Sequence, residues 1–210
     1  MPLLNSCGEI FDVDESGDMS ALKMTLSRDS LYIMPGDSLR LSVTFSPETA
    51  GQMGTLWLVD NPDVAYLRSD TIVARKPGAA IVTVASADFM CLDTCVVNVM
   101  KPWVVDRGAF FYDTVVYADI NVAGRGIADG IMVGAFVGDE LRGIATLCES
   151  GGKNYAMIRV YGPVTASTQD VITFKCYDRR EVRVRSFDVQ LPFDGESHGT
   201  LSKLVELRLD

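Results

Sequence analysis

One histidine, His198, and 28 aspartate and glutamate residues carry most of the acid–base chemistry that this 210-residue chain offers. A single histidine disfavours His-rich metal centres and the Ser-His-Asp or Cys-His arrangements that activate a nucleophile. Carboxylate pairs such as Asp139 and Glu140 suit glycoside hydrolysis, which needs two carboxyl groups about 5–10 Å apart. A chain with this many acids contains such pairs by chance, so we expect no enzyme, no metal site and no cofactor.

Three arginines in the second half of the chain, Arg180, Arg183 and Arg185, have the chemistry of an anion-binding surface. Arg183 and Arg185 alternate with Val182 and Val184, and this period of two places both guanidinium groups on one face of a strand. Such a face binds an anionic glycan through paired hydrogen bonds. The alternative is a solvated strand face on which the arginines pair with nearby acids.

Phe110, Phe111 and Tyr112 follow one another, with Trp103 and Tyr117 close by in the sequence. Exposed aromatic rings stack on sugar faces, and apolar surface patches often mark binding sites. We therefore treat Phe111 and Tyr112 as candidate ligand contacts together with the three arginines. The alternative is that these rings fill a sandwich core or an interface between domains.

The composition is typical of a folded chain, and its negative net charge disfavours binding to polyanions such as nucleic acids. Hydrophobic residues make up 48% and charged residues 22%, which is typical of a globular protein. The formal net charge is −9, so lysines and arginines are too few to neutralise a phosphate backbone, and we expect no nucleic-acid partner. There is also no run of about 18 apolar residues that would form a membrane-spanning helix.

The segment Leu4-Asn-Ser-Cys7 resembles the lipobox that precedes the lipid-modified cysteine of bacterial lipoproteins. The acidic residues that follow, 8–18, resemble the surface-export signal of lipoproteins in the Bacteroides group. A lipobox requires a basic and an apolar segment before it, and only three residues precede Leu4. Cys7 is accordingly a lipidation site if the full gene supplies a signal peptide, and this anchor is the only contact with a membrane that we expect. The alternative is an unpaired cysteine at a frayed terminus.

Residues 12–18 also match the opening of a calcium-binding EF-hand loop, with oxygen ligands at the first, third and fifth positions and a glycine at the sixth. The twelfth position of such a loop supplies a bidentate Glu, and here it is Lys23, whose charge repels calcium. We therefore interpret this stretch as a solvated acidic linker.

The other four cysteines are expected to be free, buried thiols. Cys91 and Cys95 would be about 13 Å apart on one straight strand, which is too far for a disulfide, and they pair only if residues 92–94 form a turn. Cys148 and Cys176 complete the set.

Short alternating or β-branched runs, separated by Gly, Pro, Asn and Asp, predict an all-β chain. Seven candidate strands precede Met100, the dipeptide Lys101-Pro102 interrupts the pattern, and a second series follows. We predict an acidic N-terminal linker (1–28) and two β-sandwich domains (29–101 and 102–210). The predicted strands are 30–33, 38–45, 54–59, 65–68, 71–75, 79–86, 95–100, 110–122, 131–137, 140–148, 155–161, 171–177, 180–191 and 204–209.

Three ordered blocks in the first domain resemble the bacterial immunoglobulin-like domains of group two. These blocks are Leu31–Leu41 with its Pro-Gly turn, Trp57–Ala65 with a Trp and an Asn-Pro, and Lys76–Val84, in which Gly-Ala-Ala-Ile-Val-Thr (78–83) resembles the family's Gly-x-Ala-x-Ile-Thr segment. The resemblance implies an immunoglobulin-like fold in which Trp57 fills the core. Residues 134–143, Gly-Ala-Phe-Val-Gly-Asp-Glu-Leu-Arg-Gly, resemble a hairpin found in β domains of secreted and surface proteins of Bacteroidetes, and they imply a similar location and fold.

These resemblances favour a non-enzymatic adhesion or binding protein at the cell surface, anchored in the outer membrane or secreted. The immunoglobulin-like domain would act as a stalk, and the second domain would recognise an extracellular glycan or protein. One alternative is a carbohydrate-binding accessory lipoprotein of a glycan-uptake system. Another is a structural spacer or assembly subunit, in which exposed strand edges pair with other subunits.

Overall fold

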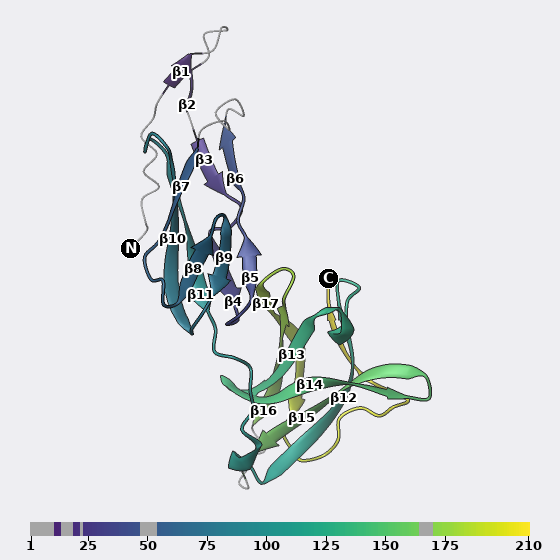
Figure 1. The fold of residues 1–210 in the computed structure, drawn as a ribbon. Helices are drawn as coiled ribbons and strands as arrows, with labels where there is room; N and C mark the ends of the chain where they lie inside the picture. Colours follow the sequence, from purple (N-terminus) through teal and green to yellow (C-terminus); the bar gives the residue numbers. More distant parts are fainter. Residues whose placement is uncertain (1–10, 14–18, 22, 47–53, 164–169) are drawn as a thin grey trace. The chain divides into compact units, whose positions relative to one another are not determined.

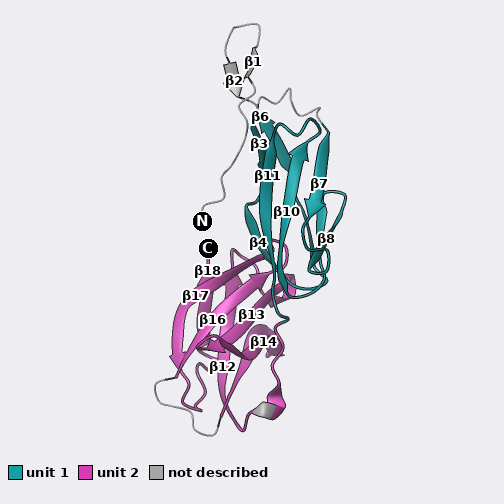
Figure 2. Ribbon diagram, turned by 90° about the vertical axis from the view of Figure 1, so that its left-hand side faces the viewer, with its two compact units in different colours: residues 1–102 teal, residues 103–210 magenta. Residues whose placement is uncertain are grey.

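A computed structural model describes residues 11–13, 19–21, 23–46, 54–163 and 170–210 of the chain. These residues fold into β-strands, turns and two short 3₁₀ segments, so the predicted all-β class is confirmed. None of the described residues forms a helix long and apolar enough to cross a membrane. The chain divides into two compact units, Met1–Pro102 and Trp103–Asp210, which are described in turn (Figure 2).

Unit 1 is built from several small sheets. The largest has four strands in the order β4-β11-β10-β7, and a second sheet has three strands in the order β5-β9-β8. Two further antiparallel pairs, β3 with β6 and β1 with β2, complete the unit (Figure 1). The strands are β1 (Phe11–Val13), β2 (Met19–Ala21), β3 (Lys23–Leu26), β4 (Ser30–Ile33), β5 (Ser38–Arg40), β6 (Val43–Ser46), β7 (Thr55–Val59), β8 (Ala65–Arg68), β9 (Thr71–Ala74), β10 (Gly78–Ser86) and β11 (Leu92–Val99).

The predicted strand 38–45 is divided in the structure between two sheets. Its first half, β5, pairs with β9, and its second half, β6, pairs with β3. At the junction the Leu41 N–H donates to the carbonyl oxygen of Asp70, and the Ser27 N–H donates to the carbonyl oxygen of Ser42. The apolar alternation survives this change of partner, since Leu41 is buried and Ser42 is exposed.

Strand β3 lies inside the stretch that we predicted to be an acidic linker, residues 1–28. Its residues Met24 and Leu26 are buried in unit 1, and the Leu26 N–H donates to the Asp93 carboxylate at 2.7 Å. Residues 23–26 therefore contribute a strand and part of the core rather than a linker. Trp57, predicted to fill the core, is half-buried in β7, and its indole N–H donates to the Thr55 hydroxyl at 3.0 Å.

Unit 2 is one continuous seven-stranded sheet in the order β17-β16-β13-β14-β15-β12-β18. The sheet curls until it nearly closes as a barrel, and the Arg185 Nη1 of one edge strand donates to the Asp210 carbonyl oxygen beyond the other edge strand at 2.6 Å. We predicted a sandwich of two separate sheets for residues 102–210. The structure differs, because β14 pairs with both β13 and β15 and so joins all seven strands into one sheet. The strands are β12 (Tyr112–Val122), β13 (Ile131–Val137), β14 (Glu140–Ser150), β15 (Lys153–Gly162), β16 (Val171–Asp178), β17 (Arg183–Pro192) and β18 (Val205–Leu209).

The β13–β14 hairpin explains how one strand serves both halves of the sheet. Gly138, at the two-residue turn, has a φ of +59°, a conformation that glycine adopts without steric cost. Beyond the turn, β14 pairs first with β13 and then, from Ala145 onward, with β15. Gly143 lies just before that change, and a Cβ there would be 2.5 Å from the carbonyl oxygen of Arg159. Gly143 does not have a positive φ, so a glycine is required here because the two strands pack too closely to leave room for a side chain.

Alternating side chains of the curled sheet point inward and form the core of unit 2. Because successive residues of a strand face opposite sides, every second residue is left on the outer surface. The polar and aromatic residues between the core positions of β12, β14 and β15 therefore form an outer face. The buried core consists of Val116, Ala118, Val122, Ile131, Val133, Ala135, Ala156, Ile158, Val160, Ile172, Phe174, Cys176, Phe187, Phe193 and Leu207.

Candidate binding groove

A groove of about 630 Å³ lies on the outer face of unit 2, between strands β14 and β15 and the chain segment that leads into β12. Its floor comes from outward-facing positions of the paired strands, where Thr146 lies opposite Met157. Its volume falls in the range of pockets that hold small molecules, about 300–1,000 Å³. We call it the β14–β15 groove; its lining residues are Trp103, Val104, Val105, Arg107, Ile144, Thr146, Met157, Arg159 and Tyr161.

Aromatic rings are fixed along the groove by contacts with one another. Trp103 meets the ring of Phe136 edge-on, with centroids 5.5 Å apart and planes at 77°. Phe110 stacks on Tyr161 with centroids 6.4 Å apart and planes at 21°. Such pairs contribute beyond their buried area, so they hold the segment 103–110 against the sheet.

Two arginines surround the ring of Tyr161. The guanidinium carbons of Arg107 and Arg159 lie 5.9 Å and 5.8 Å from the ring centroid, within the range of a cation–π contact. Arg159 also donates two hydrogen bonds of 2.9 Å to the two carboxylate oxygens of Asp113. These bonds and the charge of Asp113 raise the pKa of Arg159, which keeps its guanidinium protonated.

Arg142 adds a third cation next to the groove, and it is largely buried. Its Nη1 donates to the Tyr161 carbonyl oxygen at 3.3 Å, its Nη2 pairs with Glu140 at 2.7 Å, and its guanidinium lies 4.7 Å from the centroid of Phe110. Its buried Nε has no hydrogen-bond partner among the described residues. Arg142 therefore connects the stacked pair of Phe110 and Tyr161 to strand β14.

The three arginines named in the sequence analysis lie elsewhere on unit 2. Arg183 and Arg185 line a second hollow of about 230 Å³, and Arg180 belongs to the turn between β16 and β17. There the Arg180 N–H donates to Asp178 Oδ1 at 3.0 Å. The hollow is organised by Asp178, an almost completely buried carboxylate that forms an ion pair with Arg125.

The hydrogen bonds to Asp178 stabilise the fold by joining two loops of unit 2. Burial alone would raise the pKa of Asp178, but hydrogen bonds from Arg125 and from the backbone N–H groups of Glu181 and Arg180 outweigh it and lower the pKa. The carboxylate thus fastens the β16–β17 turn to the loop after β12, and little of it is open to a ligand.

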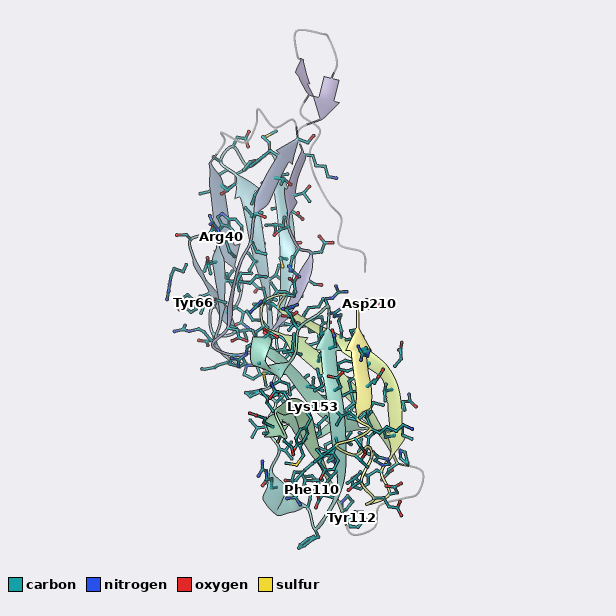
Figure 3. All side chains as sticks on the ribbon, turned by 90° about the vertical axis from the view of Figure 1, so that its right-hand side faces the viewer. Arg40, Tyr66, Phe110, Tyr112, Lys153 and Asp210 are labelled. Atoms are coloured by element: carbon teal, nitrogen blue, oxygen red, sulfur yellow. The ribbon has the colours of Figure 1, made fainter. Side chains whose placement is uncertain are left out.

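The two candidate aromatics also lie outside the groove, as neither lines it. Phe111 is 85% exposed, whereas Tyr112 is anchored: its hydroxyl donates to the Asp194 carbonyl oxygen at 2.8 Å, and its ring meets Phe193 edge-on. Figure 3 shows Phe110 and Tyr112 near one end of unit 2, with Asp210 near the other. Of the consecutive aromatics, Phe110 is the one that joins the aromatic and arginine cluster.

Residues 195–199 read Gly-Glu-Ser-His-Gly, which has the G-x-S-x-G spacing of a hydrolase nucleophile elbow. A nucleophile elbow is a strained turn between a strand and a helix. Here the segment lies in the connection from β17 to β18, and no helix follows. His198 Nε2 lies 2.8 Å from the Pro192 carbonyl oxygen and 3.3 Å from Asp194, so the ring is engaged with the loop rather than with Ser197.

The remaining predicted features have less to do with the groove. Cys91, Cys95 and Cys176 are buried thiols, as expected, whereas Cys148 is half-buried; none of the four forms a disulfide within the described part of the chain. Burial raises the pKa of Cys95 to about 11, so this thiol is unreactive at neutral pH. No group of three or more His, Cys, Asp or Glu side chains suited to a metal ion occurs in the described residues. Cys7 and most of the calcium-like stretch lie outside them.

In comparisons with known proteins, no family model matches this chain and no curated protein matches its sequence. Aromatic rings, guanidinium groups and hydroxyls line this open hollow, and groups of these kinds can contact a ligand by stacking, ion pairing and hydrogen bonding. Sequence reasoning missed Arg107, Arg142, Arg159 and Tyr161. One signal was present for the last two, which alternate with the core residues Ile158 and Val160 on β15 and must therefore face outward.

Proposed function

We propose that this protein is a non-enzymatic binding protein of the bacterial cell surface and that the β14–β15 groove is its recognition site. The observation that carries the proposal is the arrangement of Arg107 and Arg159 around the ring of Tyr161 on an otherwise open surface. Fixed aromatic and arginine side chains are the residue types that dominate binding energies in interfaces, because they are large and lose little entropy when bound.

The surroundings of Asp113, the carboxylate that pairs with Arg159, favour binding over catalysis. General acid–base chemistry needs a carboxyl group that is free to exchange its proton. Both carboxylate oxygens of Asp113 accept hydrogen bonds from Arg159, so this group positions the arginine.

Unit 1 fits the role of a spacer that carries the binding unit. The proposal that it is an immunoglobulin-like sandwich is supported by apolar residues buried on both β4-β11-β10-β7 and the smaller sheets, among them Ile33, Val97 and Ile72. A lipid on Cys7 would anchor the chain to the outer membrane. Mass spectrometry of the N-terminal peptide from the native host tests this anchor, and Cys7 without acyl mass would contradict it.

Binding of the full chain to a panel of glycans and extracellular-matrix proteins tests the proposal. We expect selective binding to at least one member, and loss of at least about tenfold in affinity on Tyr161→Ala, since interface aromatics often contribute 2 kcal/mol or more. Tyr66→Ala is the matched control, because Tyr66 is also half-buried and also has an arginine, Arg75, 5.0 Å from its ring centroid, yet lies outside the groove. Binding that is unaffected by Tyr161→Ala, or absent from the whole panel, would contradict the proposal.

A second candidate function, a structural or assembly subunit, is favoured by the free edge of the four-stranded sheet in unit 1. Strand β7 is one of the two edge strands and pairs with β10 alone among the described residues, and its Leu56 and Leu58 are 48% and 67% exposed. Unpaired edges with exposed apolar residues promote strand pairing between chains. Sedimentation over a range of protein concentrations tests this candidate, which predicts self-association that Leu58→Lys abolishes.

A further inference from the structure

We infer that the β14–β15 groove binds an acidic sugar of an extracellular glycan, whose anionic group lies against Arg107 and Arg159. The inference rests on the proposed function and adds to it the chemical class of the ligand. Three properties of the groove support it, namely its local charge, the orientation of its cations and its unused polar groups.

The local charge of the groove is opposite to that of the chain. The protein carries a net charge of −9, yet the charged residues that line the groove are Arg107 and Arg159. Asp113 neutralises Arg159 through two hydrogen bonds. No ion pair or hydrogen bond of the Arg107 guanidinium occurs among the described residues. The neighbouring Asp106 carboxylate accepts from the Gly108 N–H at 3.0 Å instead, so the donors of Arg107 are open to an anion.

Arg159 is held in place before any ligand binds, because Asp113 accepts two of its hydrogen bonds, and Arg107 lies beside the same aromatic ring. Both guanidinium groups lie against the ring of Tyr161, and that ring is fixed in turn by the stacked Phe110. Arg142 contacts the same pair of residues, since its guanidinium lies 4.7 Å from the centroid of Phe110 and donates to the Tyr161 carbonyl oxygen. A guanidinium group binds a carboxylate in a planar, two-bond geometry, and fixing it beforehand lowers the entropy cost of binding.

The rest of the groove suits the remainder of a sugar ring. The Thr146 hydroxyl and the Trp103 indole N–H form no hydrogen bond within the described residues and are available to sugar hydroxyls. Met157 and Ile144 form an apolar floor for the C–H face of the ring. An acidic peptide would also meet the arginines, but hydroxyl-binding groups combined with aromatic walls favour the glycan.

Isothermal titration of the full chain with matched charged and neutral sugars tests the inference. The probes are trigalacturonate and its methyl ester, sialyllactose and lactose, and a sulfated chondroitin oligosaccharide to distinguish sulfate from carboxylate. A peptide of alternating Glu and Ser provides the peptide arm. We expect an acidic sugar to bind, its neutral counterpart to bind at least about tenfold more weakly, and the affinity to fall with added salt.

Variants then locate the binding and separate the two claims. Arg107→Gln should weaken acidic-sugar binding about tenfold to a hundredfold, whereas Arg208→Gln should leave it unchanged. Equal binding of charged and neutral sugars, both lost on Tyr161→Ala, would overturn the inference and leave the proposed function standing. Preference for the acidic peptide, or no binding of any acidic sugar, would also overturn the inference; insensitivity of all binding to Tyr161→Ala would overturn the proposed function itself.

Discussion

Two aspartate–arginine pairs in unit 2 show how burial changes the role of the same two residue types. Asp178 is almost completely buried, and it accepts hydrogen bonds from Arg125 and from two backbone N–H groups. Asp113 pairs with Arg159 at a site where half of the arginine is exposed. Exposed pairs contribute little to stability, whereas removing one partner of a buried pair leaves an uncompensated charge.

We predict that Asp178→Ala destabilises the protein by about 3 kcal/mol at pH 7, because Arg125 and the turn lose their acceptor. The pKa of Asp178 is lowered in the folded state, so its contribution is fully present above the unfolded pKa of about 4 and is lost as the pH falls through the folded pKa. Urea unfolding at pH 7 and at pH 3 measures this: the difference between wild type and variant should shrink at pH 3. If Asp178→Ala lowers the free energy of unfolding at pH 7 by no more than Asp113→Ala does, the stabilising role of Asp178 is contradicted.

At the scale of elements, β14 determines the position of the groove because it is shared by both halves of the curled sheet. Its close approach to β15 at Gly143 brings the outward-facing residues Thr146 and Met157 together. The sequence predicts the hairpin well, since residues 131–137 match β13 and the Gly-Asp turn is a common one. It does not predict that β14 changes partner, because that depends on which strands flank it in space.

We predict that Gly143→Ala both destabilises the protein and weakens ligand binding. The new methyl group would lie 2.5 Å from the carbonyl oxygen of Arg159. Because this oxygen belongs to the backbone of β15, the clash can be relieved only if β15 moves. The expected loss is about 1–3 kcal/mol, as for other overpacked sites, with a further loss of affinity because Arg159 and Tyr161 move with β15. Gly54→Ala is the control, since its Cβ would meet only Ala87 at 3.8 Å. If Gly143→Ala and Gly54→Ala have the same thermal unfolding midpoint, the close packing of β14 on β15 at Gly143 is contradicted.

At the scale of the whole molecule, hydrophobic patterning predicts the all-β class and most strands, because alternation depends only on which side of a sheet is buried. The binding groove could not be predicted in the same way. Arg107, Arg142 and Arg159 are separated by 35 and 17 residues in sequence and are brought together by the pairing of β12, β14 and β15. Of the three arginines that the sequence suggested, Arg180 lies in the β16–β17 turn, where its backbone N–H donates to Asp178, and Arg183 and Arg185 lie on β17.

A ligand in the β14–β15 groove would lie beside Trp103, one of the lining residues, so the fluorescence of Trp103 is the best reporter of binding there. The chain has two tryptophans, so Trp57→Phe leaves Trp103 as the sole indole. Titrating this variant with the acidic sugars should give a saturable change in emission that Arg107→Gln weakens and Arg208→Gln does not. If a sugar binds the chain by calorimetry but leaves the Trp103 emission unchanged, it does not bind in the β14–β15 groove, and the proposed recognition site is contradicted.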